Sequence, residues 1–119
     1  MQLNINEYKK VQSIAKSVLQ DIKPFIKAAA PGKTFEEIFL EMNALIKSLG
    51  FENLDFLGNV GHTIEVDKND RLYFEKGNSA ALGQDTLFTF EPHIRAAGGR
   101  WGFKLENIYY FENGVAREL

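Results

Sequence analysis

The chain has 119 residues, of which 45% are hydrophobic and 25% charged, and its 14 basic and 16 acidic side chains leave a net charge of −2. This size and composition predict one folded domain over residues 1–119 and exclude a disordered chain. The charge gives no basic surface for nucleic acid, and no apolar run reaches the roughly 18 residues of a membrane span. With no cysteine, disulfides, thiol catalysis and cysteine-bound zinc are excluded. We therefore expect a cytoplasmic protein that binds neither nucleic acid nor membrane.

An amphipathic helix is predicted at the start of the chain, from Ile5 onward. Its apolar residues recur at steps of three and four, while Lys and Gln fill the other face. Pro24 lies inside this run and is expected to end or kink the helix near Ile22 or Lys23. The predicted apolar stripe consists of Tyr8, Val11, Ile14, Ala15, Val18, Leu19, Ile22, Phe25 and Ile26.

A second amphipathic helix is predicted after the turn at Pro31-Gly32. Thr34 can accept a hydrogen bond from the amide of Glu37, which makes it the expected N-cap, and Gly50 is the expected C-cap. The predicted apolar stripe consists of Phe35, Ile38, Phe39, Met42, Leu45, Ile46 and Leu49.

Strands are predicted in the last third of the chain, where the hydrophobic period changes. We expect strands over Asp85–Ile94 and Trp101–Phe111, because aromatic and β-branched residues gather there and partly alternate with polar ones. Asn113-Gly114 predicts a tight hairpin turn that leads into a returning strand over Val115–Leu119. The fold class is therefore α+β, with two N-terminal amphipathic helices packed on an antiparallel sheet.

The two histidines of the chain are candidates for a binding or metal site. His62 follows Gly61, which frees the backbone on its N-terminal side, and His93 follows the Glu91-Pro92 pair. Either imidazole has an ordinary alternative, as a hydrogen-bonded structural residue. The pattern of residues around them leaves both interpretations open.

Two carboxylates, Glu91 and Glu106, lie inside aromatic-rich segments where an acidic side chain needs a partner. An unpaired buried carboxylate costs several kcal/mol. A salt bridge to Lys104 or Arg95 would satisfy that need. A divalent metal ion would also satisfy it, since hard cations take oxygen ligands and a histidine nitrogen can complete such a site.

Four short segments together resemble a known family. Gly61–Ile64, Thr89–Ile94, Lys104–Tyr109 and Glu112–Gly114, in this order, are similar to the C-terminal half of the pita-bread metallopeptidases. That family includes methionine aminopeptidase, Xaa-Pro aminopeptidase, proline dipeptidase and creatinase. The Pro31-Gly32 turn between two helices also fits the family pattern, so that the resemblance extends over nearly the whole chain.

The resemblance implies a metal site and an activity. His62, Glu91 and Glu106 would be three of five ligands to two divalent ions (Mn, Co, Zn or Fe), and the three side chains are expected to converge. His62 and Glu91 would be the catalytic residues, with Glu91 as general acid or base, and His93 is a candidate for contacting the substrate. The implied function is that of a C-terminal portion of a metal-dependent aminopeptidase that hydrolyses N-terminal peptide bonds.

The sequence departs from the family pattern at its start and after His62. The family's other two ligands are aspartates on a hairpin before the first helix, where only Met1–Asn6 stand, and the family's second histidine has no equivalent here. We therefore expect the chain alone to bind metal weakly and to be inactive, and to form a homodimer or associate with a missing N-terminal half. The alternative function is a non-catalytic pita-bread-like binding or interaction module. A structural domain without a site would require Glu91 and Glu106 to point away from His62.

Overall fold

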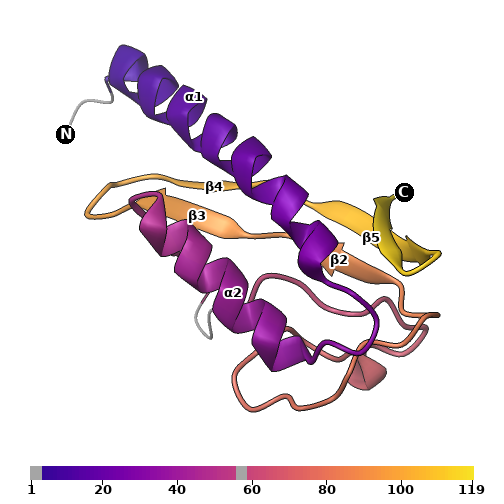
Figure 1. Cartoon of the computed structure of the whole chain (residues 1–119). Coiled ribbons are helices and arrows are strands. Elements are labelled where there is room, and N and C mark those ends of the chain that lie inside the picture. The colour runs from indigo at the N-terminus through magenta and orange to yellow at the C-terminus, as the bar shows by residue number, and fades with distance from the viewer. Residues whose placement is uncertain (1–3, 56–58) are drawn as a thin grey trace.

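The computed structural model describes residues 4–55 and 59–119, in which two long helices lie on one side of paired antiparallel strands (Figure 1). The elements in chain order are α1 (Ile5–Ile22), the 3-10 helix η1 (Lys23–Ala28), α2 (Phe35–Ser48), β1 (Phe51–Asn53), the 3-10 helix η2 (Lys68–Asp70), β2 (Phe88–Phe90), β3 (His93–Ala96), β4 (Gly102–Lys104), β5 (Asn107–Glu112) and β6 (Val115–Glu118). The predicted α+β class is confirmed. No helix in these two ranges is long and apolar enough to cross a membrane.

Helix α1 begins and ends where its local sequence signals lie. Asn4 caps its N-terminus by accepting a hydrogen bond from the Glu7 amide at 3.1 Å. Helix α1 ends at Ile22, and the chain continues as η1 because Pro24 interrupts the α-helical hydrogen bonds. The predicted apolar stripe is only partly buried, since the side chain of Ile14 is 49% exposed.

Helix α2 confirms the predicted caps and leads into a strand that was not predicted. The Thr34 hydroxyl accepts a hydrogen bond from the Glu37 amide at 3.1 Å. Gly50, at φ +83°, adopts the left-handed conformation that ends a helix without Cβ strain. The next three residues form β1, whose Phe51 stands opposite Ala96 of β3. Strand β1 is too short for a hydrophobic period to be recognised in the sequence.

The strands form two hydrogen-bonded sets, β1-β3-β4 and β2-β5-β6, where one sheet was predicted. The predicted strand over Asp85–Ile94 is divided at Glu91-Pro92, because proline has no amide hydrogen for a ladder bond. The two sets nevertheless share one register. Phe90 stands opposite Asn107 on one side of the break, and His93 stands opposite Lys104 on the other.

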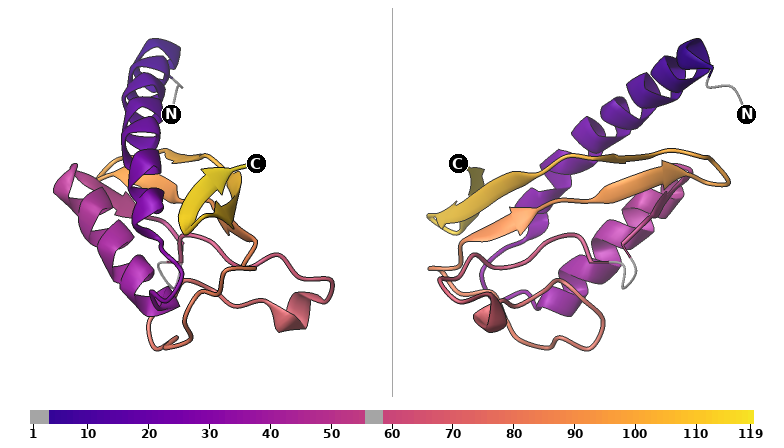
Figure 2. Two further views of the ribbon diagram at one scale, coloured as in Figure 1. Left: turned by 45° about the vertical axis from the view of Figure 1, so that its right-hand side comes forward. Right: turned by 180° about the vertical axis from the view of Figure 1, so that it is seen from behind.

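The hydrophobic core lies between the helices and one face of these strands. Both helices lie on this same side in the front view (Figure 1) and in the rear view (Figure 2). Phe74 joins the two layers, since its ring lies 4.9 Å from that of Phe35 on α2 and 5.5 Å from that of Phe88 on β2. The buried hydrophobic residues that the strands contribute are Phe51, Phe88, Phe90, Ile94, Phe103, Tyr109 and Ala116.

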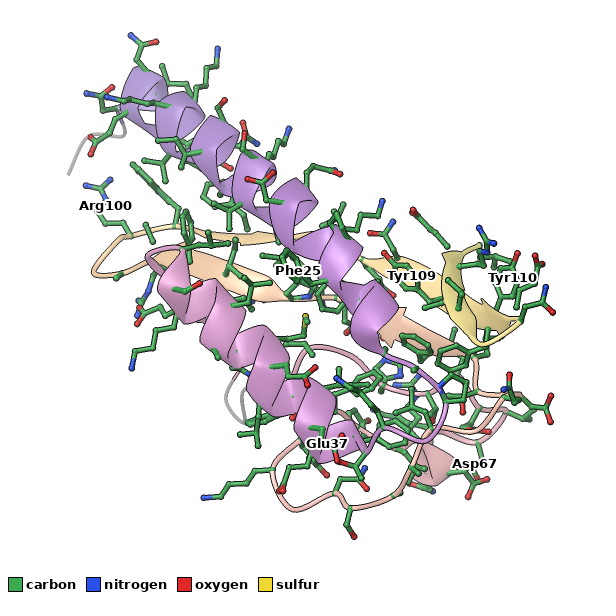
Figure 3. All side chains as sticks on the ribbon, viewed as in Figure 1. Phe25, Glu37, Asp67, Arg100, Tyr109 and Tyr110 are labelled. Atoms are coloured by element: carbon green, nitrogen blue, oxygen red, sulfur yellow. The ribbon has the colours of Figure 1, made fainter. Side chains whose placement is uncertain are left out.

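The two ends of the strand layer are built differently. At one end the Tyr8 ring of α1 packs edge-on against Trp101, which lies just before β4, at 5.3 Å. Arg100 belongs to this end and Tyr110 to the other (Figure 3). The far end closes with the predicted hairpin turn, whose Asn113 and Gly114 both have positive φ.

Candidate functional site

A row of polar side chains occupies the face of the strands that is turned away from the helices. Alternate residues of a strand point to opposite faces, and directly opposed residues share a face. Because Phe88 and Phe90 point to the core, Thr89 and Glu91 point away from it. The shared register then adds residues of the other strands to the same face. The row consists of Thr89, Glu91, His93, Arg95, Lys104 and Glu106.

His62 joins this row because its segment runs antiparallel beside β2. The Thr89 amide donates to the His62 carbonyl at 2.8 Å, and the Glu91 amide donates to the Val60 carbonyl at 2.7 Å. Gly61 allows this close pairing, since a Cβ at that position would lie 2.0 Å from the Thr89 carbonyl oxygen. A glycine is therefore required before His62, because the backbone of Thr89 lies too close for any side chain there.

The imidazole of His62 is oriented toward Glu91. Its Nδ1 lies 2.8 Å from the Thr63 carbonyl oxygen, which can only accept, so we assign the proton to Nδ1. In the neutral ring Nε2 then carries the lone pair, and it lies 3.6 Å from Oε2 of Glu91. The side chains are only 14% and 19% exposed. Two acceptors that face each other in a largely buried place require a cation or a proton between them.

The ammonium of Lys104 supplies a positive charge on the other side of Glu91. Its Nζ lies 3.2 Å from Oε1, which is the salt bridge expected as the alternative to a metal ion. Arg95, the other expected partner, pairs with Glu52 instead.

A small cavity of about 100 Å³ brings the site together. It contains His62, Glu91, His93 and Lys104 and also residues that sequence reasoning missed. The cavity is lined by Asp55, Asn59, Gly61, His62, Tyr73, Glu91, His93 and Lys104. The Tyr73 ring lies 5.5 Å from that of His62, from a loop with no motif to mark it. Asp55 and Asn59 could have been noticed only as polar residues shortly before the Gly-His pair.

Glu106 is the one predicted ligand that is not gathered into this cavity. Its backbone stands opposite Glu91 in the shared register, and its exposed side chain lines a separate hollow with Glu118 and Leu119. Within residues 4–55 and 59–119, no group of three or more His, Asp or Glu side chains is placed to hold a metal ion. The expected convergence is therefore found for His62 and Glu91 and not for Glu106. The strand pairing places the backbone of Glu106 opposite Glu91, but the exposed Glu106 side chain can adopt several rotamers.

His93 lies in the cavity as expected for a residue that could contact a ligand. It stands opposite Lys104 and close to Gly102 of the next strand. A Cβ on Gly102 would lie 2.6 Å from Nε2 of His93, so the glycine makes room for the imidazole.

The donor atoms fit one side of a divalent-metal site. Zinc-type ions bind histidine nitrogen and carboxylate oxygen at about 2.0–2.2 Å, so two ligands of one ion lie less than about 4.4 Å apart. The 3.6 Å between His62 and Glu91 meets this condition. The Nδ1 hydrogen bond to a backbone carbonyl is also the usual support of a histidine ligand. Glu106 could complete the set by a rotamer change, since its backbone already faces Glu91.

Comparison with known protein families identifies the relatives of this chain. The profile of metallopeptidase family M24 matches residues 4–113. The chain belongs to metallopeptidase family M24. The matched range includes α1, α2 and every residue of the polar row, and it confirms the family predicted from the short motifs. No curated protein sequence matches the chain.

Solved M24 structures share this fold. X-Pro aminopeptidase from Thermotoga maritima superposes with a TM-score of 0.69 at 23% identity, over 94% of this chain and 30% of that one. Prolidase from Pyrococcus furiosus gives 0.68 at 22% identity, over 92% and 31%. Methionine aminopeptidase from Rickettsia prowazekii gives 0.67 at 14% identity, over 98% and 53%. The chain thus has part of the pita-bread fold and spans from 30% to 53% of the length of these proteins.

Proposed function

We propose that this chain supplies one side of the metal centre of an aminopeptidase and is inactive by itself. The reaction would be hydrolysis of N-terminal peptide bonds of the X-Pro or Met-X type. The observation that carries the proposal is the pair of acceptors, Nε2 of His62 and Oε2 of Glu91, which lie 3.6 Å apart on side chains that are 14% and 19% exposed. Membership of family M24 supports the same conclusion.

The residues have different roles in this proposal. His62 and Glu91 would hold a divalent ion such as Mn, Co, Zn or Fe, and Glu106 would join them from the neighbouring strand. A bound ion would supply a more acidic water and polarisation of the scissile carbonyl. Glu91 would also take up and return a proton, because its second oxygen is free to do so when Lys104 moves away. His93, which lines the same cavity, would contact the peptide.

Metal ligands other than His62, Glu91 and Glu106 would come from another polypeptide segment. Among the described elements no helix covers the polar face, and the strands lie open in the rear view (Figure 2). A second copy of the chain or another segment of an M24 protein could therefore approach it. We propose that such an association, as a homodimer or with a complementary half, completes the site.

Metal titration of the chain tests the proposal. Calorimetry with Mn²⁺ or Zn²⁺ should give weak binding, and His62→Ala or Glu91→Gln should weaken it further, by at least about tenfold. Glu65→Gln is the matched control, because Glu65 is exposed and lies outside the cavity. Binding that is unchanged in both site variants would contradict the proposal. Turnover of an X-Pro or Met-X peptide by the chain alone would contradict its inactivity.

The second candidate is a non-catalytic binding module, and the Lys104 ammonium favours it. That charge lies 3.2 Å from Glu91 and already satisfies one of its oxygens. The same titration separates the two functions. A module without a metal site should bind no divalent ion at any concentration, in the wild-type chain or after removal of the lysine charge.

A further inference from the structure

The Lys104 side chain occupies a position from which it controls the charge of the proposed metal site. Lys104 lies on β4 opposite His93, and its Nζ is 3.2 Å from Oε1 of Glu91. The other oxygen of the same carboxylate faces Nε2 of His62. The Glu91 carboxylate thus lies between the Lys104 ammonium and the place where a divalent metal ion would bind.

A divalent ion and the ammonium would compete for this carboxylate. Both are positive, and an ion between His62 and Glu91 would lie within several ångström of Nζ. The repulsion would be only partly screened by solvent, since Glu91 is 19% exposed. Lys104 itself is 46% exposed, and its long flexible side chain can turn out to water when the ion arrives.

The remaining charges around the cavity do not replace this role. Asp55 lines the same cavity and is negative, so it would attract the ion. Arg95 stands on the same strand face but is paired with Glu52. Among the described residues that line the cavity, Lys104 is the one lysine or arginine. A metal ion would therefore have to displace its ammonium group from Glu91.

We propose that Lys104 is a built-in counter-cation that lowers the affinity of this site for divalent metal. It neutralises Glu91 while the ion is absent and yields the carboxylate when the ion binds. The inference rests on the proposed function and adds to it the residue that sets metal affinity.

The test compares metal affinity in charge variants of Lys104. Lys104→Met removes the charge and keeps most of the side-chain length, and it should tighten binding of Mn²⁺ or Zn²⁺ by about tenfold in calorimetry. Lys104→Arg keeps the charge and should leave the affinity within about twofold of wild type. Lys76→Met is the matched control, because Lys76 is exposed and does not line the cavity. Lys104→Gln serves as a second neutral variant should the methionine variant fold poorly.

The outcomes separate this inference from the proposed function. Tighter binding in Lys104→Met that is lost again in Lys104→Met/Glu91→Gln supports the inference. Wild-type binding that depends on His62 and Glu91 but does not tighten in Lys104→Met overturns the inference and leaves the proposed function intact. Absence of binding in the wild type and in both neutral variants overturns both. Tighter binding that survives Glu91→Gln also overturns the inference, since the ion would then bind elsewhere.

Discussion

The two faces of the β2–β5 and β3–β4 ladders differ in polarity: one face is apolar and the other is charged. One face packs Phe88 and Phe90 against the helices, with exposed fractions of 0% and 2%. The other carries Glu91 and Lys104 and lies open in the rear view (Figure 2). Adjacent residues along one strand thus belong to a core and to a site.

This difference separates what stabilises the molecule from what it can bind. Apolar burial provides most of the stability of a fold, whereas a half-exposed ion pair contributes about 1 kcal/mol or less. The polar face can therefore carry charged side chains that bind a ligand at little cost to the stability of the fold. The apolar face cannot tolerate comparable changes, and the following predictions exploit this contrast in order of decreasing effect.

Phe88→Ala should cause the largest loss of stability. The side chain is fully buried between Phe74 and Tyr109, and its removal is expected to lower the free energy of unfolding by about 3–5 kcal/mol. Urea denaturation measures this change. Thr89→Ala is the matched control on the other face, with an expected loss of about 1 kcal/mol from the His62 amide–hydroxyl hydrogen bond. Equal losses in the two variants would contradict the contrast between the faces.

Gly61→Ala should be nearly as costly, although it adds only a methyl group. The new Cβ would lie 2.0 Å from the Thr89 carbonyl oxygen, so that the His62 segment would have to separate from β2. We expect a loss of about 3 kcal/mol, measured by thermal or urea unfolding. Gly83→Ala is the control, because its Cβ would meet nothing closer than 3.8 Å. A stable Gly61→Ala chain would show that this pairing is loose.

Tyr109 should make stability depend on pH in the alkaline range. Burial, with a smaller contribution from the charge of Glu118, raises the pKa of its phenol from 10.0 to about 12. Between these values the unfolded chain loses the proton while the folded chain keeps it, so the unfolded state is favoured as pH rises. The free energy of unfolding should fall by about 2 kcal/mol from pH 10 to pH 12 and show little of this effect below about pH 9.

Comparison with Tyr109→Phe isolates the contribution of this phenol. Its hydroxyl is buried and has no hydrogen-bond partner among the residues that the structure describes, so the variant should be about as stable as wild type at pH 7. The difference in stability between the two proteins should then grow above pH 10. Parallel pH profiles would mean that the phenol titrates normally in the folded state.

Glu91→Gln should have the smallest effect on stability. The amide keeps an acceptor for the half-exposed Lys104, so we expect a change of less than about 1 kcal/mol in urea denaturation. Glu65→Gln provides the reference for an exposed glutamate. A loss of several kcal/mol would place Glu91 among the residues that support the fold and would weaken its assignment to a binding site.

The helices could be predicted because their signals are local. The cap at Thr34, the glycine at position 50 and the proline at position 24 act within one helical turn, and each lies where the structure begins or ends a helix. The short strand β1 could not be predicted in the same way. Three residues carry no hydrophobic period, and β1 exists because β3, more than 40 residues away, offers it hydrogen bonds.

The candidate site could be predicted only in part. The short motifs indicated His62, Glu91 and His93, and all three line one cavity. They also indicated Glu106, whose exposed side chain lies elsewhere. Tyr73 was missed, because a loop without periodicity gives no sign of which strand it will approach.

The sequence alone determined the family, the helix ends and the alternation of apolar and polar residues, since these depend on neighbours along the chain. The tertiary structure decided which residues meet. One register continues across the break at Glu91-Pro92, and the His62 segment adds to the opposite side of β2. Those pairings join residues from 7 to 31 positions apart, and the Lys104–Glu91 ion pair follows from them. Contacts of this kind depend on packing of the whole chain, because no local pattern specifies the partner of an unpaired strand edge.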